Sequence, residues 1–331
     1  MVAAGALVDR FGRVHTDLRV SLTDRCTLRC TYCMPEEGVP WLDRGELLSD
    51  DEIVRVVSVA AGLGVRSVRL TGGEPLLRPG LADLVARLAA IPPGLQLSVT
   101  TNGLRLRELA PALAAAGLRR VNVSLDTLRP DVFTALTRRP GHDKVLDGLA
   151  AAAEAGMTPV KVNTVLTRGV NDSEVLDLLE FCLERGYELR FIESMPLDAQ
   201  HEWSRDAMVP AAEIVEAVSA AHALTPEPTR GSAPAETWLV DGGPARLGII
   251  ASVTAPFCGA CDRLRLTADG QIRNCLFATD ESDLRSVLRS GASDARLAEV
   301  WQAAVAGKKK GHGIDDPSFI RPQRPMSAIG G

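Results

Sequence analysis

Apolar and polar residues alternate along several short runs of the chain, and amphipathic runs of longer period separate them. A period of two residues predicts strands, and a period of 3.6 residues predicts helices. Ser49 and Glu52 form a capping-box pattern that begins a helix at Asp50. The strands expected in the first part of the chain are 18–23, 66–71, 96–101, 121–125, 160–166 and 188–194, and the helices are 50–63, 81–91, 107–116, 144–155, 173–185 and 209–222.

Each of these strands has one apolar and one polar side. The polar sides carry Arg19, Ser21 and Thr23; Arg69 and Thr71; Gln96, Ser98 and Thr100; Asn122, Ser124 and Asp126; and Lys161 and Asn163. A doubly wound sheet needs two apolar faces, because helices cover both of them. A half-exposed antiparallel sheet fits poorly with the helices between the strands. The pattern therefore predicts an α/β fold, an incomplete (β/α)6 TIM-type barrel with a polar lumen, whose active site lies where the strands end.

The composition changes after residue 222. The stretch 225–234 is rich in Pro, Thr, Gly and Ser, which is typical of a linker or surface loop. Strands are expected at 237–240 and 246–251, a hairpin at 264–273 that turns at Asp269 and Gly270, and helices at 283–289 and 294–306. We therefore expect a barrel domain over residues 1–222 and a C-terminal subdomain over 223–331.

Length and charge narrow the function classes. A chain of 331 residues suits either one barrel-sized domain with an appendage or two domains. The formal net charge of −5 argues against a nucleic-acid-binding surface. No signal peptide opens the chain, and no apolar run approaches the roughly 20 residues that span a bilayer. We expect a soluble, cytoplasmic protein whose cysteines are metal ligands or free thiols, because that compartment is reducing.

Six of the seven cysteines fall into two sets of three. Cys26, Cys30 and Cys33 have C-x3-C-x2-C spacing directly after the first strand. A second set consists of Cys258, Cys261 and Cys275, which the expected hairpin brings together. Three thiolates are an incomplete set for a cluster or a structural zinc, and they leave one metal position open to an outside ligand. The alternatives are cysteines that fall close together without a role, or zinc completed by a distant histidine.

The remaining cysteine and several cations complete the residue pattern. Cys182 shares an apolar helix face, so we expect a buried thiol. Arg263 and Arg265 lie two apart on a strand and point the same way, and the forked donors of arginine suit phosphate oxygens. Arg19, Arg69 and Lys161 share the inward phase, whereas Arg190 is out of phase with Glu193 and Met195 on its own strand. This basic lining inside an acidic protein predicts a small polyanionic substrate.

These motifs resemble a known family. The C-x3-C-x2-C loop with Tyr32 before its last cysteine, followed by Gly-Gly-Glu-Pro after the second strand, is similar to the radical S-adenosylmethionine superfamily. Further stretches resemble the GTP 3′,8-cyclase family of molybdenum cofactor biosynthesis, and they extend from residue 18 to residue 331. They are LRVSLTDRCTLRCTYCMP, RLTGGEPLLR, TTNG, VNVSLD, RFIESMP, FCGACDRLRL, NCLF and the terminal Gly330-Gly331.

The resemblance implies two [4Fe–4S] clusters and S-adenosylmethionine as cofactors. Cys26, Cys30 and Cys33 would hold the cluster that binds S-adenosylmethionine, and Tyr32, Gly73, Ser124 and Met195 would contact that cofactor. Cys258, Cys261 and Cys275 would hold the second cluster, in the C-terminal subdomain, with its open iron on the guanine base of GTP. The residues that would hold the nucleotide are Arg19, Arg69, Thr100, Lys161, Arg263, Leu264 and Arg265. The Gly330-Gly331 tail would reach into the active site.

The implied activity is the conversion of GTP to (8S)-3′,8-cyclo-7,8-dihydroguanosine 5′-triphosphate. A 5′-deoxyadenosyl radical would remove the 3′ hydrogen of the ribose, the carbon radical would add to carbon 8 of guanine, and an electron and a proton would complete the product. The product would pass to cyclic pyranopterin monophosphate synthase. The sequence admits a homodimer but does not identify the electron donor. A radical enzyme that modifies peptides and a zinc-binding module without catalytic activity are the alternative functions.

Overall fold

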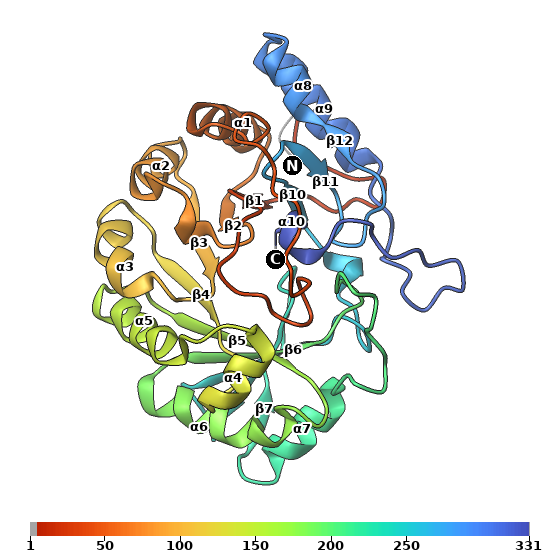
Figure 1. Ribbon diagram of the computed structural model, residues 1–331. Helices are drawn as coiled ribbons and strands as arrows, with labels where there is room; N and C mark the ends of the chain where they lie inside the picture. Colours follow the sequence, from red (N-terminus) through yellow and green to blue (C-terminus); the bar gives the residue numbers. More distant parts are fainter. Residues whose placement is uncertain (1–4, 331) are drawn as a thin grey trace.

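The computed structural model describes residues 5–330 and contains one twelve-stranded sheet flanked by helices (Figure 1). The strand order is β12-β11-β10-β1-β2-β3-β4-β5-β6-β9-β8-β7. The strands are β1 Asp17–Ser21, β2 Ser67–Thr71, β3 Gln96–Thr101, β4 Arg120–Ser124, β5 Val160–Leu166, β6 Glu188–Glu193, β7 Leu224–Pro226, β8 Glu236–Val240, β9 Arg246–Ile250, β10 Arg263–Leu266, β11 Gln271–Arg273 and β12 Ser282–Asp283. The helices are α1 Asp50–Gly62, α2 Leu81–Ala89, α3 Leu106–Ala115, α4 Pro130–Thr137, α5 His142–Glu154, α6 Val175–Arg185, α7 Ala211–Ser219, α8 Leu284–Arg289, α9 Asp294–Ala306 and α10 Met326–Ile329.

The centre of the sheet is a run of parallel strands in chain order from β1 to β6. Two later strands extend this run in the same direction, β10 beside β1 and β9 beside β6. Antiparallel strands then border both edges, and the two edges do not pair with each other within residues 5–330. The sheet is thus a curved barrel that remains open, as the strand pattern predicted. The strands after residue 222 contribute to both of its edges.

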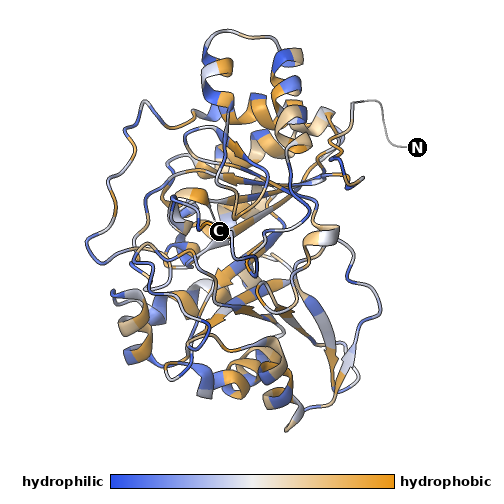
Figure 2. Ribbon diagram, turned by 90° about the vertical axis from the view of Figure 1, so that its right-hand side faces the viewer, coloured by the Kyte–Doolittle hydropathy of each residue, from blue (hydrophilic) through white to orange (hydrophobic). Residues whose placement is uncertain are grey.

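Two faces of each strand meet two different environments. The alternate apolar residues, such as Leu18 on β1 and Val121 on β4, belong to the hydrophobic core together with the inner faces of the helices. Figure 2 shows these apolar segments inside the molecule and hydrophilic residues on the outer sides of the helices. The other face aligns polar side chains across neighbouring strands, for instance Arg19 opposite both Arg69 and Arg265. This alignment confirms the predicted polar lumen.

Local sequence accounts for most element boundaries. Ser49 accepts a hydrogen bond from the backbone N–H of Glu52 at 3.2 Å, and the Glu52 carboxylate accepts one from the backbone N–H of Ser49 at 2.8 Å, which completes the predicted capping box of α1. Four elements were not expected, namely helices α4 and α10 and strands β7 and β12. Helix α4 begins at Pro130, whose fixed φ suits the first helical turn. Strand β7 pairs with β8, so the expected linker 225–234 begins within a strand.

No helix within residues 5–330 has the length and apolar character that crossing a membrane requires.

Candidate functional site

The first cysteine set lies on the loop after β1. Cys26, Cys30 and Cys33 are all partly buried and unbonded to one another. Burial raises the pKa of Cys26 to about 11 and that of Cys33 to about 12, and it raises the pKa of Cys30 well above its ordinary value. The proximity of Cys33 and Cys26 raises the pKa of Cys30 further. Three crowded, desolvated thiols become thiolates only when a cationic centre compensates their charge, as an iron–sulfur cluster does.

The Gly72-Gly73 pair is packed against the first residues of this loop. A Cβ atom at Gly73 would lie 2.4 Å from the carbonyl oxygen of Arg25, and one at Gly72 would lie 2.5 Å from that of Thr23. The backbone N–H of Gly73 donates to the Thr23 carbonyl at 2.7 Å, and that of Glu74 donates to the Arg25 carbonyl at 2.7 Å. The close contact between the two loops therefore requires glycine at both positions, even without a ligand beside them.

Glu74 is a buried carboxylate that ties β2 to β3. It accepts hydrogen bonds from the backbone N–H of Leu76 at 2.9 Å, the hydroxyl of Thr101 at 2.7 Å and the backbone N–H of Asn102 at 2.7 Å. Burial outweighs these three bonds and raises the pKa of Glu74 to about 6. Asn102 in turn donates to Thr27 at 3.1 Å, so this network also holds the cysteine loop in place.

The Tyr32 side chain is fixed at the end of β4. Its hydroxyl donates to Asp126 at 2.6 Å, and the second oxygen of Asp126 accepts from the backbone N–H of Val165 at 2.8 Å. Burial raises the pKa of Asp126 to about 6. Ser124 lies two residues before Asp126, opposite Asn163 of β5. Tyr32, Gly73 and Ser124 thus lie at the strand ends, in the loop after β1, directly after β2 and at the end of β4, and their contact with a cofactor stays a prediction.

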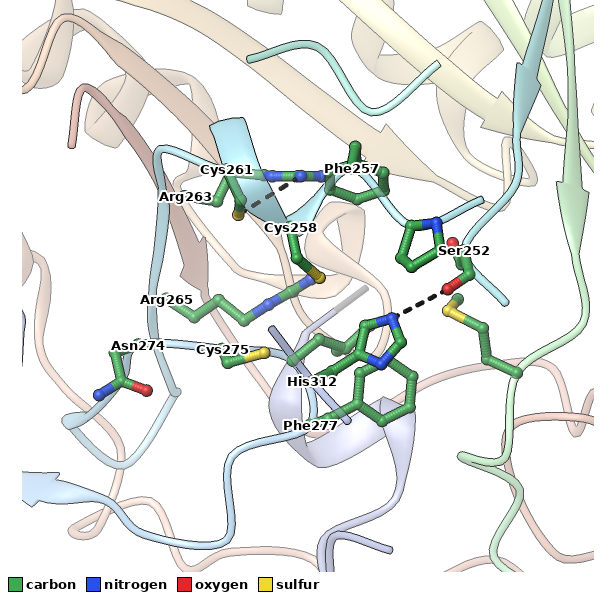
Figure 3. A pocket seen from close by; sticks show the side chains of 13 residues that line it. Ser252, Phe257, Cys258, Cys261, Arg263, Arg265, Asn274, Cys275, Phe277 and His312 are labelled. Atoms are coloured by element: carbon green, nitrogen blue, oxygen red, sulfur yellow. Dashed lines mark hydrogen bonds between the residues drawn. The ribbon is translucent and has the colours of Figure 1, made fainter. Parts of the chain in front are cut away.

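The second cysteine set lines a cavity that holds about 520 Å³ of empty space, its open mouth included. The sulfur atoms of Cys258, Cys261 and Cys275 turn toward a common space beside the Arg265 guanidinium (Figure 3). Met195 also lines this cavity, so the structure places it on the side of the second set. The lining residues are Met195, Ser252, Pro256, Phe257, Cys258, Cys261, Arg263, Arg265, Asn274, Cys275, Leu276, Phe277 and His312.

Two cations lie against Cys261. Arg263 is 3.5 Å and the Lys308 ammonium 3.6 Å from its sulfur, and Lys308 also donates to the Arg263 carbonyl at 2.6 Å. Burial raises the pKa of Cys261, but the charges of Arg263 and Lys308 lower it by more, so its net shift is downward. The Cys261 site is thus already electropositive, which favours a thiolate ligand.

Sequence reasoning missed Lys308, and it also missed an N-terminal support for the same loop. Arg13 donates to the Cys258 carbonyl at 2.6 Å and to the carbonyls of Lys310 and Lys309 at 3.0 Å and 2.7 Å. Asp9 accepts from the Arg13 side chain at 2.6 Å. The three carbonyl partners of Arg13 lie more than 240 positions from it in the sequence, so no local spacing could have indicated them.

Four arginines on adjacent strands form a basic wall of the lumen. They are Arg19, Arg69, Arg263 and Arg265. Burial lowers the pKa of Arg19 to about 9, and the nearby charges of Arg69 and Arg263 lower it further. Burial also lowers the pKa of Arg69 to about 10 and that of Arg265 well below its ordinary value. The Nε atoms of Arg19 and Arg263 are buried without a hydrogen-bond partner. Clustered cations with unused donors fit an anionic ligand such as a triphosphate.

The basic lining continues across β5 and β6. Lys161 forms an ion pair with Glu188, and burial lowers the pKa of Lys161 to about 8. Arg190 also faces the lumen: it aligns with Asn163, and its charge lowers the pKa of Arg69 and of Lys161. The comparison of Arg190 with Glu193 on the same strand, made from the sequence, was misleading. The Glu193 carboxylate faces the side opposite to the lumen, where it accepts a hydrogen bond from the backbone N–H of Ala211 at 2.9 Å.

Two further residues expected at the nucleotide lie on these strands. Thr100 aligns with Asn122 on the lumen face of β3. Leu264 lies between Arg263 and Arg265, with its side chain in the hydrophobic core. Any contact between Leu264 and a nucleotide would therefore come from its backbone.

The C-terminal tail enters this site. The carbonyl oxygen of Gly330 accepts a hydrogen bond from Arg265, and a Cβ atom at Gly330 would lie 2.6 Å from the Thr71 hydroxyl and 3.0 Å from Ser21. Ser327 donates its backbone N–H to Cys33, which moderates the raised pKa of that thiol. The tail thus contacts both the first cysteine set and the basic wall. Gly331 lies outside the described residues.

Both cysteine sets have the chemistry of iron–sulfur cluster ligands. Within residues 5–330, no three His, Cys, Asp or Glu side chains converge closely enough to share one ion. A [4Fe–4S] cluster does not need such convergence, since each thiolate binds a different iron. Both sets supply three soft thiolates, and both border the basic wall through the tail or the cavity.

Comparison with known proteins agrees with this geometry. Residues 20–182 match the Radical SAM superfamily, and residues 187–314 match Molybdenum Cofactor Synthesis C. A Streptomyces coelicolor protein named GTP 3′,8-cyclase is 64% identical over 99% of this chain and 97% of its own length. The chain belongs to the GTP 3′,8-cyclase family. A Mycobacterium tuberculosis protein named GTP 3′,8-cyclase 2 is 57% identical over 99% of this chain and 92% of its own length.

A solved structure supports the fold of this GTP 3′,8-cyclase family member. Streptococcus suis SuiB bound to S-adenosylmethionine superposes with a TM-score of 0.57 at 14% identity, over 87% of this chain and 68% of SuiB. Membership confirms the predicted family, the radical enzyme class, the cofactor set of two [4Fe–4S] clusters and S-adenosylmethionine, and the place at the first step of molybdenum cofactor biosynthesis. It also decides against the alternatives of a peptide-modifying enzyme and a zinc module.

Proposed function

We propose that the chain converts GTP to (8S)-3′,8-cyclo-7,8-dihydroguanosine 5′-triphosphate inside the open barrel, between the two cysteine sets. The observation that carries this proposal is the buried arginine wall. Arg19, Arg69 and Arg265 align across adjacent strands, and their charges repel one another. Such a cluster costs stability unless an anion occupies it, so its presence supports a polyanionic substrate at this position.

The cysteines would hold the two clusters. Cys26, Cys30 and Cys33 take the first, and Cys258, Cys261 and Cys275 take the second. When bound, the clusters and S-adenosylmethionine supply the one-electron chemistry of the reaction. Tyr32, Gly73 and Ser124 border the S-adenosylmethionine side of the chamber. Met195, which lines the cavity of the second set, would contact the cofactor from the opposite wall.

The lumen residues would bind and orient GTP. Arg69, Lys161 and Arg19 offer cationic donors for the triphosphate, and Thr100 lies on the same face. Arg263 and Arg265 flank the second cysteine set, so they would position the guanine and ribose end, with Leu264 contributing through its backbone. Holding the reacting carbons in one orientation supplies much of the acceleration expected of such an enzyme.

The tail would exclude water from the reacting atoms. Ser327, Ile329 and Gly330 are buried between the first cysteine loop and Arg265. A carbon radical at this position would otherwise react with solvent or with the wrong side chain. Exclusion by a packed segment also strengthens the electrostatic contacts to the triphosphate.

An anaerobic assay tests the substrate. Cluster-reconstituted protein receives S-adenosylmethionine and a strong reductant together with GTP, ATP or no nucleotide, and the release of 5′-deoxyadenosine is measured. We expect release coupled to the loss of GTP alone. Release that ignores the nucleotide would refute GTP as the substrate, and an absence of release from protein with intact clusters would refute the catalytic assignment.

The same proposal includes four further features. The chain would be cytoplasmic and would form a homodimer, residues 1–222 and 223–331 would be its two domains, and its product would pass to cyclic pyranopterin monophosphate synthase. Sedimentation of the holoenzyme tests the homodimer, and limited proteolysis near residue 222 tests the domain division. A coupled assay with the purified synthase tests the transfer of the product.

A further inference from the structure

A short N-terminal hairpin forms an exposed patch over the second cysteine set. Val8 and Val14 pair through an isolated β-bridge, and the chain turns between them at Arg10 and Phe11. Within residues 5–330 four large hydrophobic side chains are exposed, and three of them, Val8, Phe11 and Val14, belong to this hairpin. Single exposed apolar residues are ordinary on a protein surface, but three on one hairpin form a patch of the kind that marks an interaction site.

Cations surround the apolar centre of the patch. The guanidinium groups of Arg10 and Arg13 lie over the Phe11 ring, at 5.1 Å and 5.2 Å from its centroid. The carbonyls of Lys309 and Lys310 accept hydrogen bonds from Arg13, which places both residues beside the hairpin. Both lysines are exposed. We name Val8, Arg10, Phe11, Val14, Lys309 and Lys310 the hairpin patch. Its cations stand out in a protein of formal net charge −5.

Acidic groups near the patch are already engaged. Asp9 is buried, where it accepts hydrogen bonds from Arg13 and from the backbone N–H of Phe11. Asp262 accepts from Thr16 at 2.8 Å, and Asp315 forms an ion pair with Arg205. In contrast, Arg10, Lys309 and Lys310 form no ion pair within the described residues. The charges of Arg10, Lys309 and Lys310 together exceed that of Asp262, so the patch presents net positive charge around an apolar centre.

The patch is joined directly to a cluster ligand. Arg13, whose guanidinium lies over Phe11, donates to the carbonyl oxygen of Cys258 at 2.6 Å. The neighbouring Gly259 and Ala260 are exposed, so the loop of the second set itself reaches the surface beside the hairpin. Figure 1 shows the N-terminal segment, in red, next to β10. The loop that carries Cys258 and Cys261 leads directly into that strand.

We propose that the hairpin patch docks a small acidic one-electron carrier protein that reduces the second cluster. The proposal rests on the cluster assignment above. One electron leaves the reduced carrier, which becomes oxidised, and reduces the second [4Fe–4S] cluster from the 2+ to the 1+ state; no proton or bond is exchanged. An apolar centre with a charged rim is the usual form of a protein interface, and transient electron-transfer interfaces are small.

The test uses a plant-type [2Fe–2S] ferredoxin of acidic surface as the carrier. Anaerobic stopped-flow absorbance follows the reduction of the reconstituted holoenzyme by the reduced ferredoxin at several ionic strengths. The wild-type rate is expected to fall as salt rises. The variant Lys309→Glu/Lys310→Glu is expected to lower the rate about tenfold at low salt, and Phe11→Ala is expected to lower it several-fold at every ionic strength.

A matched control places the same charge change on another surface. Arg119 and Lys144 are exposed and form no ion pair within the described residues, so Arg119→Glu/Lys144→Glu should keep the wild-type rate within about twofold. Reduction by dithionite should be equal in all variants. Dithionite-driven release of 5′-deoxyadenosine with GTP tests the proposed function separately, because dithionite does not need the patch.

Three results would overturn the proposal. One is equal reduction by ferredoxin in the wild type and in Lys309→Glu/Lys310→Glu. Another is a wild-type holoenzyme that ferredoxin does not reduce at all. The third is a sedimentation result in which the wild type is a dimer and Lys309→Glu/Lys310→Glu is a monomer. That result would assign the patch to contact between two copies of the chain.

Discussion

Arg265 donates a hydrogen bond to the carbonyl oxygen of Gly330, so the end of the chain is held against the basic wall of the lumen. Gly330 has a φ of 86° and no space for a side chain between Thr71 and Ser21. This contact joins the last described residue to β10, whose arginines lie next to the loop that carries Cys258 and Cys261. The tail is therefore part of the chamber wall.

Gly330→Ala should displace the tail. The added Cβ atom would lie 2.6 Å from the Thr71 hydroxyl, and the positive φ is strained for alanine. We expect kcat/KM for GTP to fall about 10-fold to 100-fold, with the iron content unchanged. Gly45→Ala is the matched control, because no atom lies within 4 Å of its Cβ position and its φ is ordinary. Steady-state rates that match for both variants would show that the tail does not shape the active site.

Arg19→Met should affect stability and activity in opposite directions. Arg19 is a buried cation surrounded by other cations, with an Nε atom that has no partner. Its removal should stabilise the nucleotide-free protein by about 1–2 kcal/mol, while the KM for GTP rises at least about tenfold. Denaturant unfolding and steady-state kinetics measure the two effects. A variant that is destabilised, or one that keeps its KM, would argue against the arginine wall as an anion site.

Lys308→Met should lower the reduction potential of the second cluster. The Lys308 ammonium contacts the Cys261 sulfur, and a nearby cation favours the more negative, reduced state. The expected shift is roughly −50 to −100 mV, equivalent to about 1–2 kcal/mol for one electron. Lys308→Arg should restore most of it. A potentiometric titration followed by electron paramagnetic resonance measures both clusters, and the first serves as the internal control. A shift shared by both clusters would indicate a general structural effect.

Glu74→Gln should change how stability depends on pH. The folded-state pKa of Glu74 is raised from 4.5 to about 6, so between these values the folded protein holds a proton that the unfolded chain has lost. The stability that protonated Glu74 contributes is complete below pH 4.5 and is lost as pH rises through about 6, a loss of about 2 kcal/mol. The glutamine variant cannot show this loss. Urea unfolding at pH 4.5 and pH 7 should therefore give different wild-type-minus-variant stabilities, and a constant difference would contradict the raised pKa.

Local patterns predicted the parts of this structure that local forces determine. The capping box at Ser49, the hairpin turn at Asp269 and Gly270 and the shared side of Arg263 and Arg265 all depend on residues a few positions apart. Strand parity predicted the polar lumen for the same reason, because side chains alternate on every strand. Cys182 is fully buried, as the apolar helix face predicted.

The remaining features depend on contacts between distant segments. Nothing near Lys308 indicates that its ammonium meets Cys261, and nothing near Arg13 indicates its bond to the Cys258 carbonyl. The pairing of β10 with β1 is equally nonlocal, although it creates the arginine wall. The resemblance implies only that Gly73 contacts the cofactor, and the structure adds a tight contact of both Gly72 and Gly73 with the cysteine loop that no single motif could reveal.

The most direct test of the account is the iron content of anaerobically reconstituted protein. We expect about eight iron atoms per chain in the wild type and in Cys182→Ala, and about four in both Cys26→Ala and Cys258→Ala, because each set holds its own cluster. Each of the two depleted variants should also lose GTP turnover. A single substitution that removed all of the iron, or a Cys258→Ala variant that kept eight atoms and full turnover, would contradict two separate three-cysteine cluster sites.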